Sequence, residues 1–253
     1  PVQEALEYAQ DQRVANIDET GWREKGKKAY LWTLATPMVT IYMIAATRSR
    51  EAANRLLGMF GGILICDRYS VYESWPAEWK QYCWAHLKRT FTKISERRGR
   101  PGRIGKALLR QTRLLFKHWH RARDGTLKLT TFRRKAETTR KRVRRILKRG
   151  ARCGDAATEG TCRKILCDFD ALWTFCREAG VEPTNNRAEQ ALRPAVIWRK
   201  CCFGTWSAPG SRLVERLMTV RTSLRQQRRN VLAFLTDAYT AHITRMQAPS
   251  LIP

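Results

Sequence analysis

The alternation of apolar and polar residues over the first ninety positions predicts a mixed α/β arrangement. Strands are expected over residues 13–18, 29–35 and 39–46, because these runs are rich in β-forming residues and short turns separate them. Three successive strands joined by short turns indicate an antiparallel meander. The unbroken apolar run at 63–66 is typical of a strand that is buried on both faces, and Asp67 follows it directly.

Apolar residues at helical spacing predict the helices that follow these strands. Ser49 is expected to cap a helix whose apolar residues recur up to Phe60. A fifth strand at 81–84 then leads into another helix. Residues 165–179 read as an amphipathic helix that ends at Gly180.

Three helices are predicted in the last seventy residues. Thr184 or one of the asparagines after it caps the first of them, and Pro194 limits it. A long helix follows, and Asn230 is expected to cap the last one. The residues expected on one face of the long helix are Leu213, Leu217, Val220 and Leu224.

Charge changes this picture, because the chain carries 49 Lys and Arg against 22 Asp and Glu, a formal net charge of +27. Such an excess indicates a polyanionic partner, DNA or RNA. Residues 97–152 alone hold 22 basic residues and two acids, with apolar residues at helical spacing. This stretch is therefore predicted to be helical and to contact phosphates, the alternative being a solvated charged face.

The eight cysteines and the lack of a long apolar run indicate the cellular compartment to be expected. The cysteines do not form a plausible disulfide framework, which favours reduced thiols in a cytoplasmic protein. Their spacing also lacks the paired pattern of a zinc site. No segment is apolar enough to suggest a membrane partner.

Three acids stand out in this basic chain, because Asp18, Asp67 and Glu189 lie at the edges of strand-like or helix-like segments. Carboxylates gathered at one place repel one another unless metal ions neutralise them, which is the logic of a two-metal phosphoryl-transfer centre. Glu19 competes with Asp18. Neighbours on a strand point to opposite faces, so only one of the two can face the metals, and we favour Asp18.

The predicted element order is that of the ribonuclease H-like fold: a mixed five-stranded sheet with flanking helices. In that fold the first and fourth strands are neighbours, which would bring Asp18 and Asp67 together. The gap of 122 residues between Asp67 and Glu189 is too long for a simple connection. We therefore expect a core over 1–96, a large basic helical insertion over 97–180, and completion of the core by 181–253.

Several blocks of the sequence resemble the insertion-sequence-66 transposases. They are Asp18-Glu19-Thr20-Gly21-Trp22, Asp67-Arg68-Tyr69 with Tyr72, Cys83-Trp84-Ala85-His86-Leu87-Lys88-Arg89, Asn185-Asn186-Arg187-Ala188-Glu189, Arg193-Pro194, Arg199-Lys200 and Phe203-Gly204. The blocks come in the expected order over nearly the whole chain. One departure is Thr184, where many relatives carry Asp, and we expect this chain to lack the amino-terminal DNA-recognition region of the family.

The resemblance implies that Asp18, Asp67 and Glu189 form a D-D-E triad that binds two Mg²⁺ ions, with Mn²⁺ as a substitute. The implied activity is transposition: metal-dependent cleavage of DNA strands and their transfer to target DNA. Two alternatives stay open, a catalytically silent DNA-binding remnant and a ribonuclease H-like nuclease. A homo-oligomer assembled on DNA, in a prokaryotic cytoplasm and associated with the nucleoid, is the expected setting.

Basic and amide side chains supply the candidate DNA contacts. The amides and cations flanking the acidic helix suit phosphate oxygens, and His86 is expected near the site, where it would contact DNA or orient a carboxylate. Packing at a strand-to-helix junction is the alternative for His86. The candidate residues are Asn185, Asn186, Arg199, Lys200, His86, Arg142, Arg144, Arg145 and Lys148.

Overall fold

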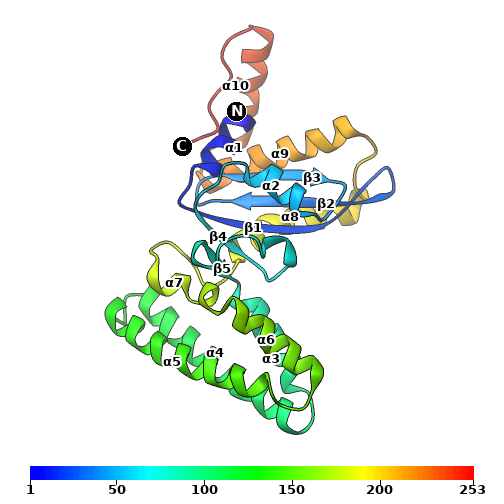
Figure 1. The fold of residues 1–253 in the computed structure, drawn as a ribbon. Helices are drawn as coiled ribbons and strands as arrows, with labels where there is room; N and C mark the ends of the chain where they lie inside the picture. Colours follow the sequence, from blue (N-terminus) through cyan, green and yellow to red (C-terminus); the bar gives the residue numbers. More distant parts are fainter. The chain divides into compact units, whose positions relative to one another are not determined.

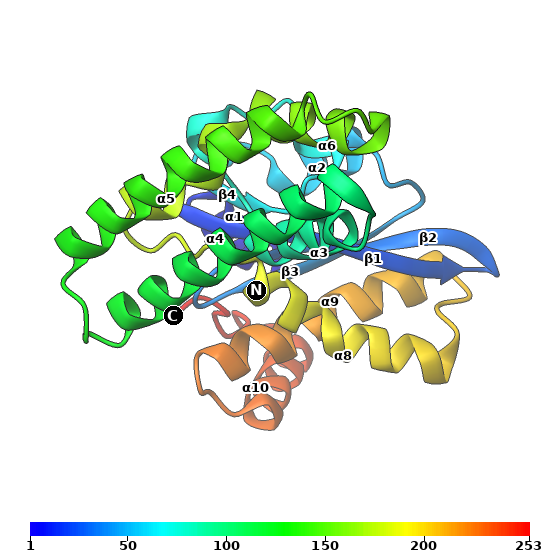
Figure 2. The same cartoon turned by 90° about the horizontal axis from the view of Figure 1, so that it is seen from below.

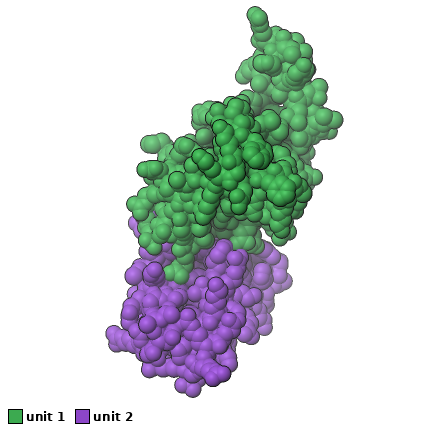
Figure 3. All heavy atoms as spheres, turned by 90° about the vertical axis from the view of Figure 1, so that its right-hand side faces the viewer, with its two compact units in different colours: residues 1–74, 185–253 green, residues 75–184 purple.

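The computed structural model describes all 253 residues, which divide into two compact units. Unit 1 comprises residues 1–74 and 185–253, and unit 2 comprises residues 75–184 (Figure 3). The chain thus leaves unit 1, forms unit 2 and returns. The predicted limits of the insertion, 97–180, stay a prediction, since unit 2 also takes in the twenty-odd residues that precede the basic helices.

The strands form a mixed sheet in the order β3-β2-β1-β4-β5. Antiparallel pairing joins β1 (Val14–Glu24) to β2 (Lys27–Ala35) and β2 to β3 (Thr40–Ala45), whereas β4 (Ile63–Cys66) runs parallel to β1. The short β5 strand is Lys80–Tyr82. The predicted α/β class, the meander and the neighbouring first and fourth strands are confirmed.

Helices cover both faces of the unit 1 strands, with α8 and α9 on one face and α2 on the other (Figure 2). The helices of unit 1 are α1 (Val2–Gln10), α2 (Arg50–Leu57), α8 (Asn186–Cys202), α9 (Ala208–Gln226) and α10 (Val231–Ile243), with a 3-10 turn η1 (Ser70–Tyr72). Between the strands and α8–α9 lies a core that includes Trp22, Leu31, Tyr42, Leu192 and Met218. This core holds α8 against β1.

Side chains of α9 bind the backbone of β3, the strand at one edge of the sheet. The N–H of Ile44 donates to Glu215 Oε1 at 2.6 Å, and the N–H of Tyr42 donates to Thr219 Oγ1 at 3.1 Å. The N–H of Thr40 donates to Ser223 Oγ at 3.0 Å. Acceptors spaced four residues apart on one helix therefore match donors spaced two apart on a strand.

Local capping signals in the sequence are confirmed. Ser49 caps α2 by accepting from the N–H of Ala52, and Asn230 caps α10 by accepting from the N–H of Ala233. The β1–β2 hairpin turns at Lys25-Gly26, where both residues have positive φ, 51° and 72°. Both angles match a two-residue hairpin turn.

The prediction that Pro194 limits its helix is wrong, because α8 continues through Pro194 to Cys202. A proline inside a helix removes one N–H, the one that would bind the carbonyl of Gln190. Gln190 is exposed, so water can replace that bond. In the same turn, the Tyr42 hydroxyl donates to the carbonyl of Ala191 at 2.6 Å and holds this stretch of α8 to the sheet.

Unit 2 is dominated by two long antiparallel helices, α4 and α5, as Figure 1 shows. Its elements are η2 (Ala77–Trp79), β5, α3 (Trp84–Ser95), α4 (Gly99–Arg123), α5 (Leu129–Gly150), α6 (Ala156–Cys167), η3 (Phe169–Leu172) and α7 (Thr174–Arg177). Leu108, Leu115, Phe132, Val143 and Leu147 are fully buried between these helices. The prediction of a helical basic stretch is confirmed.

The single helix predicted over 165–179 is wrong, because α6 ends at Cys167 and two short turns follow. Asp168 leaves the helix and accepts from the Tyr82 hydroxyl at 2.7 Å, beside Lys80 Nζ at 3.3 Å. The carbonyl of Leu172 accepts from the Trp84 indole at 2.7 Å. These long-range bonds outweigh the local helical pattern.

Candidate active site

Parallel pairing of β1 and β4 sets two of the predicted acids at the same level. Val14 pairs with Ile63 and Asn16 pairs with Ile65, and the same offset two residues further along matches Asp18 with Asp67. Asp67 directly follows the last residue of β4. Ligands of α/β sheets commonly lie at the carboxyl ends of such strands, so Asp67 lies where a site is expected, and Asp18 lies level with it inside the longer strand β1.

Asp18 lies on the face of β1 that α8 covers. Asn16 and Thr20, two residues to either side of it, bond to α8 residues: Asn16 Nδ2 donates to Asn185 Oδ1 at 2.9 Å, and Arg199 Nη1 donates to Thr20 Oγ1 at 3.4 Å. Strand side chains alternate, so Asp18 shares this face. Its neighbour Glu19 points the other way.

Glu19 is occupied on the opposite face of the strand. Arg48 Nε donates to Glu19 Oε1 at 2.6 Å, and the Tyr72 hydroxyl donates to Glu19 Oε2 at 2.5 Å. Burial raises the pKa of Glu19 more than Tyr72 and Arg48 lower it. This arrangement supports the choice of Asp18 over Glu19 as the acid that faces α8.

Asn185 fixes the start of α8, the helix that carries Glu189. Its side chain is fully buried and donates to the carbonyl of Ile17 at 2.8 Å, while its own carbonyl accepts the N–H of Glu189 at 3.1 Å. The first turn of α8 is therefore tied to β1 at the residue before Asp18. The Asn185 amide therefore positions the helix through bonds to Asn16 and Ile17, and its predicted contact with DNA stays a prediction.

The three carboxylates interact electrostatically. Burial, followed by the charge of Glu19 and then those of Asp67 and Glu189, raises the pKa of Asp18 from an ordinary 3.8 to about 7. A hydrogen bond from the N–H of Glu19 at 2.9 Å opposes this shift without cancelling it. Asp67 and Glu189 are thus among the charged groups that act on Asp18 in unit 1.

Comparison with known proteins places the chain in a family. The model of the transposase IS66 family matches residues 1–212. The chain belongs to the IS66 family of transposases. The predicted family resemblance is confirmed.

One relative is a protein of Sinorhizobium fredii (strain NBRC 101917 / NGR234) that is named only as the uncharacterized protein y4qI. It is 24% identical over 242 residues, and the match covers 85% of this chain and 44% of that protein. The chain therefore spans less than half the length of this relative. No solved structure matches the chain.

The remaining candidate DNA contacts of this IS66 chain lie on several elements. In unit 1, Asn186 is exposed at the start of α8, and Arg199 and Lys200 lie in its last turn. In unit 2, His86 is half-buried in the first turn of α3, with Nε2 3.4 Å from Arg89 Nη1. Four exposed residues of α5 complete the set: Arg142, Arg144, Arg145 and Lys148.

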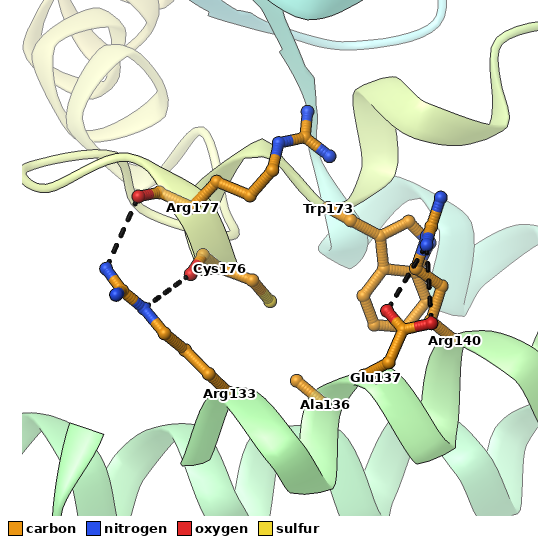
Figure 4. A pocket seen from close by; sticks show the side chains of 7 residues that line it. All are labelled: Arg133, Ala136, Glu137, Arg140, Trp173, Cys176 and Arg177. Carbon is orange, nitrogen blue, oxygen red and sulfur yellow. Dashed lines mark hydrogen bonds and ion pairs between the residues drawn. The ribbon is translucent and has the colours of Figure 1, made fainter. Parts of the chain in front are cut away.

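Arginines of unit 2 also line a pocket of about 370 Å³ between α5 and α7 (Figure 4). Arg133 donates to the carbonyls of Cys176 and Arg177, and Arg140 binds both Glu137 and Asp170. Two of the basic groups that line this pocket are thus bound to the protein itself. Because the acids Glu137 and Asp170 neutralise Arg140, we interpret this pocket as packing between α5 and α7.

Two features of unit 1 were not predicted from the sequence: the partners of Glu19, and the pair of basic residues Arg23 and Lys28. Arg48 follows β3 in a loop and Tyr72 lies in η1, so only the folded chain brings them to Glu19. Arg23 and Lys28 pair directly across the β1–β2 hairpin. Their symmetric spacing about the turn residues Lys25-Gly26 could have predicted that Arg23 and Lys28 face each other. No helix of the structure has the length and apolar character needed to cross a membrane.

Proposed function

We propose that this chain is the catalytic part of a DNA transposase, with Asp18, Asp67 and Glu189 at its centre. The proposed reaction is metal-dependent cleavage of a DNA strand followed by transfer of its 3′-hydroxyl end to target DNA. The IS66 family match supports the class of activity. The observation that carries the site is the pairing register of β1 and β4, which sets Asp18 level with Asp67, and the raised pKa of Asp18 agrees with it.

The donor set fits two Mg²⁺ ions, or Mn²⁺ in their place. Carboxylate oxygens are the ligands these hard cations prefer, and mutual repulsion among the three acids is relieved when a divalent ion is bound. Asp18, Asp67 and Glu189 would hold the ions. When bound, such ions lower the pKa of water and stabilise charge on the attacking and leaving oxygens.

The chain's own residues hold the acids in place. Asp18 Oδ1 accepts the N–H of Glu19, and Asp67 Oδ1 accepts the N–H of Tyr69, both at 2.9 Å. Each bond fixes one carboxylate oxygen, and we assign the second oxygen of each group to the metal ions. Asn185 orients the first turn of α8 and so sets the position of Glu189.

DNA is the proposed partner, both as the element's ends and as target. The charge of +27 and the exposed cations of α5 support binding to the phosphate backbone. We also propose a homo-oligomer on DNA, associated with the prokaryotic nucleoid. Exposed apolar side chains of α9 and α10 support self-association, among them Leu213, Leu232 and Ile243, of which Leu213 was expected on the packed face of its helix.

A strand-transfer assay tests this proposal. The chain is mixed with a labelled duplex that has a free 3′-hydroxyl end and with a supercoiled plasmid, in Mg²⁺, Mn²⁺ or EDTA. Metal-dependent joining of label to plasmid is the expected result. Nicking without joining would identify a nuclease, and binding without either reaction would identify a silent remnant.

A further inference from the structure

The carboxyl-terminal end of α8 and the β1–β2 hairpin enclose a second basic cavity, of about 530 Å³, on unit 1. Four cations, the exposed ring of Phe203 and the buried ring of Trp22 line it, and no acid does; the cations are Arg23, Lys28, Arg199 and Lys200. Arg23 donates to the Gly26 carbonyl at 3.1 Å and Arg199 to the Gly21 carbonyl, but neither is paired with an acid, and a guanidinium has further N–H groups to donate. Arg23 and Lys28 stand directly opposite each other across the hairpin. Like charges in that position destabilise a hairpin, so an anion between them would be stabilising.

Phe203 is held in a conformation that its residue type disfavours. It ends α8 with φ 60° and ψ 9°, the left-handed conformation that usually falls to Gly or Asn at this point of a helix. Such a conformation costs a bulky residue about 1–2 kcal/mol. The ring is also 75% exposed, so burial does not offset the strain.

The loop after Phe203 is anchored firmly to the hairpin. Thr205 exchanges backbone hydrogen bonds with the β1–β2 hairpin: its N–H donates to the Arg23 carbonyl at 2.9 Å, and its carbonyl accepts the N–H of Lys25 at 2.8 Å. Gly204 permits this approach, because a Cβ there would lie 2.2 Å from the Arg23 carbonyl oxygen. Phe203 is therefore presented on a rigid support above the basic cavity.

We propose that this cavity binds an unpaired nucleotide of the DNA substrate, with the base stacked on Phe203 and its phosphates held by the surrounding cations. Aromatic rings beside a basic groove are how proteins hold single strands, because every base offers a face for stacking. Strain and exposure at Phe203 are the features such a contact explains. This inference rests on the proposed DNA-processing function and adds how the strand is held.

The distance from the acids suits a nucleotide near the cut. Four residues of β1 separate Asp18 from Trp22, roughly 13 Å at the rise of a strand. Ten residues of α8 separate Glu189 from Arg199, roughly 15 Å at the rise of a helix. Both paths correspond to roughly four steps of a duplex strand, so the bound nucleotide would be one frayed from an end close to the cleaved phosphate.

The test removes the aromatic ring with a residue that accepts the same left-handed backbone conformation. Phe203→Asn suits the left-handed conformation, so we expect an unchanged or slightly raised Tm. The probe is a duplex with a short single-stranded end that carries 2-aminopurine, titrated in EDTA. We expect binding at least about fivefold weaker than wild type, loss of the fluorescence change on binding, and less than twofold change for the matching blunt duplex.

Two controls separate stacking from other effects. Phe203→Tyr should restore both affinity and fluorescence change, whereas Met59→Asn, which removes an even more exposed apolar side chain (95%), should change neither. Equal weakening toward both DNAs, or wild-type binding of the single-stranded end by Phe203→Asn, would overturn the inference. Because the titration contains no metal, this outcome is independent of whether the acids catalyse strand transfer.

Discussion

The carboxylates of the two units have opposite surroundings. In unit 2, Asp155 is bound by Arg97, Asp170 by Arg140, and Asp168 by Lys80. Hydrogen bonds from Thr158, followed by the charge of Arg97, hold the pKa of Asp155 below its ordinary value. In unit 1, Asp18 has other acids as its charged neighbours, and its pKa rises to about 7.

This difference separates acids that stabilise the fold through ion pairs from acids that we propose to bind a ligand. A chain with 49 basic residues can pair nearly every carboxylate, and in unit 2 it does so repeatedly. Unit 1 can also pair an acid with a base, since Arg48 binds Glu19, the residue next to Asp18. Acids whose charges raise the pKa of Asp18 amid so many cations are what the proposed metal centre would require.

The largest effect should follow from removing one charge of the acidic cluster. We expect Asp67→Asn to lower metal-dependent strand cleavage by at least roughly 10²–10³-fold, because the amide keeps the shape but weakens the hold on cations. DNA affinity should stay equal or rise slightly, since an anion that repels phosphate is lost. Cleavage assays and binding titrations of the same preparation measure both.

Asp237→Asn is the matched control for this substitution, since Asp237 is exposed on α10. It should change neither quantity. Near-normal cleavage by Asp67→Asn would remove Asp67 from the proposed centre and with it the contrast between the two units.

The next effect concerns the excess cations of unit 2. If α5 lies along the DNA backbone, changing Arg142, Arg144, Arg145 and Lys148 to Gln should lower the log–log salt slope of binding by up to about 0.9 per lost contact. Cleavage at saturating DNA should persist, because the acids of unit 1 are intact. Affinity measured across a salt series provides the slope. An unchanged slope would mean that α5 faces solvent or protein.

A smaller effect should come from breaking a paired acid of unit 2. Lys80 is almost fully buried, and Asp168→Asn removes its carboxylate partner while keeping an acceptor for Tyr82. We expect the free energy of unfolding to fall by about 3 kcal/mol, as measured by urea denaturation. Glu159→Gln breaks an exposed pair with Arg163 and should cost less than about 1 kcal/mol. Equal costs for the two would contradict a structural role for Asp168.

The smallest effect is the pH dependence that Asp18 gives to the metal-free chain. Between about pH 4 and 7 the folded chain keeps a proton that the unfolded chain has released. Stability in EDTA should therefore fall as pH rises through this window, by on the order of 1–2 kcal/mol once solvent screening is allowed for. Asp18→Asn should flatten the curve. A wild-type curve that rises over the same window would refute the raised pKa.

Local signals in the sequence predicted much of the fold. The strand that precedes Asp67, the cap at Ser49 and the short turn between the first two strands all follow from residue types at short range. The predicted end of the first strand at residue 18 is wrong, because β1 continues to Glu24 in its pairing with β2. The parallel register that places Asp18 beside Asp67 could be expected once their strands were known to be neighbours. These features depend on steric preferences that act within a few residues.

Features set by distant contacts were not predictable from the same signals. Pro194 continues a helix because Tyr42 and the sheet support it, and Asp168 ends one because Tyr82 and Lys80 bind it. The burial of Asn185 depends on Asn16 and Ile17, which are nearly 170 positions away. Strain at Phe203 likewise appears only when the loop after α8 meets the hairpin.

The hydrogen bonds that β3 donates to side chains of α9 also affect how this protein avoids aggregation. An open edge strand offers its backbone to other chains and invites aggregation. Glu215, Thr219 and Ser223 accept the outward N–H groups of β3, so this edge cannot template a further strand. Assembly on DNA would then have to proceed through side-chain surfaces, and copies crowded together on one nucleic acid would not join sheet to sheet at β3.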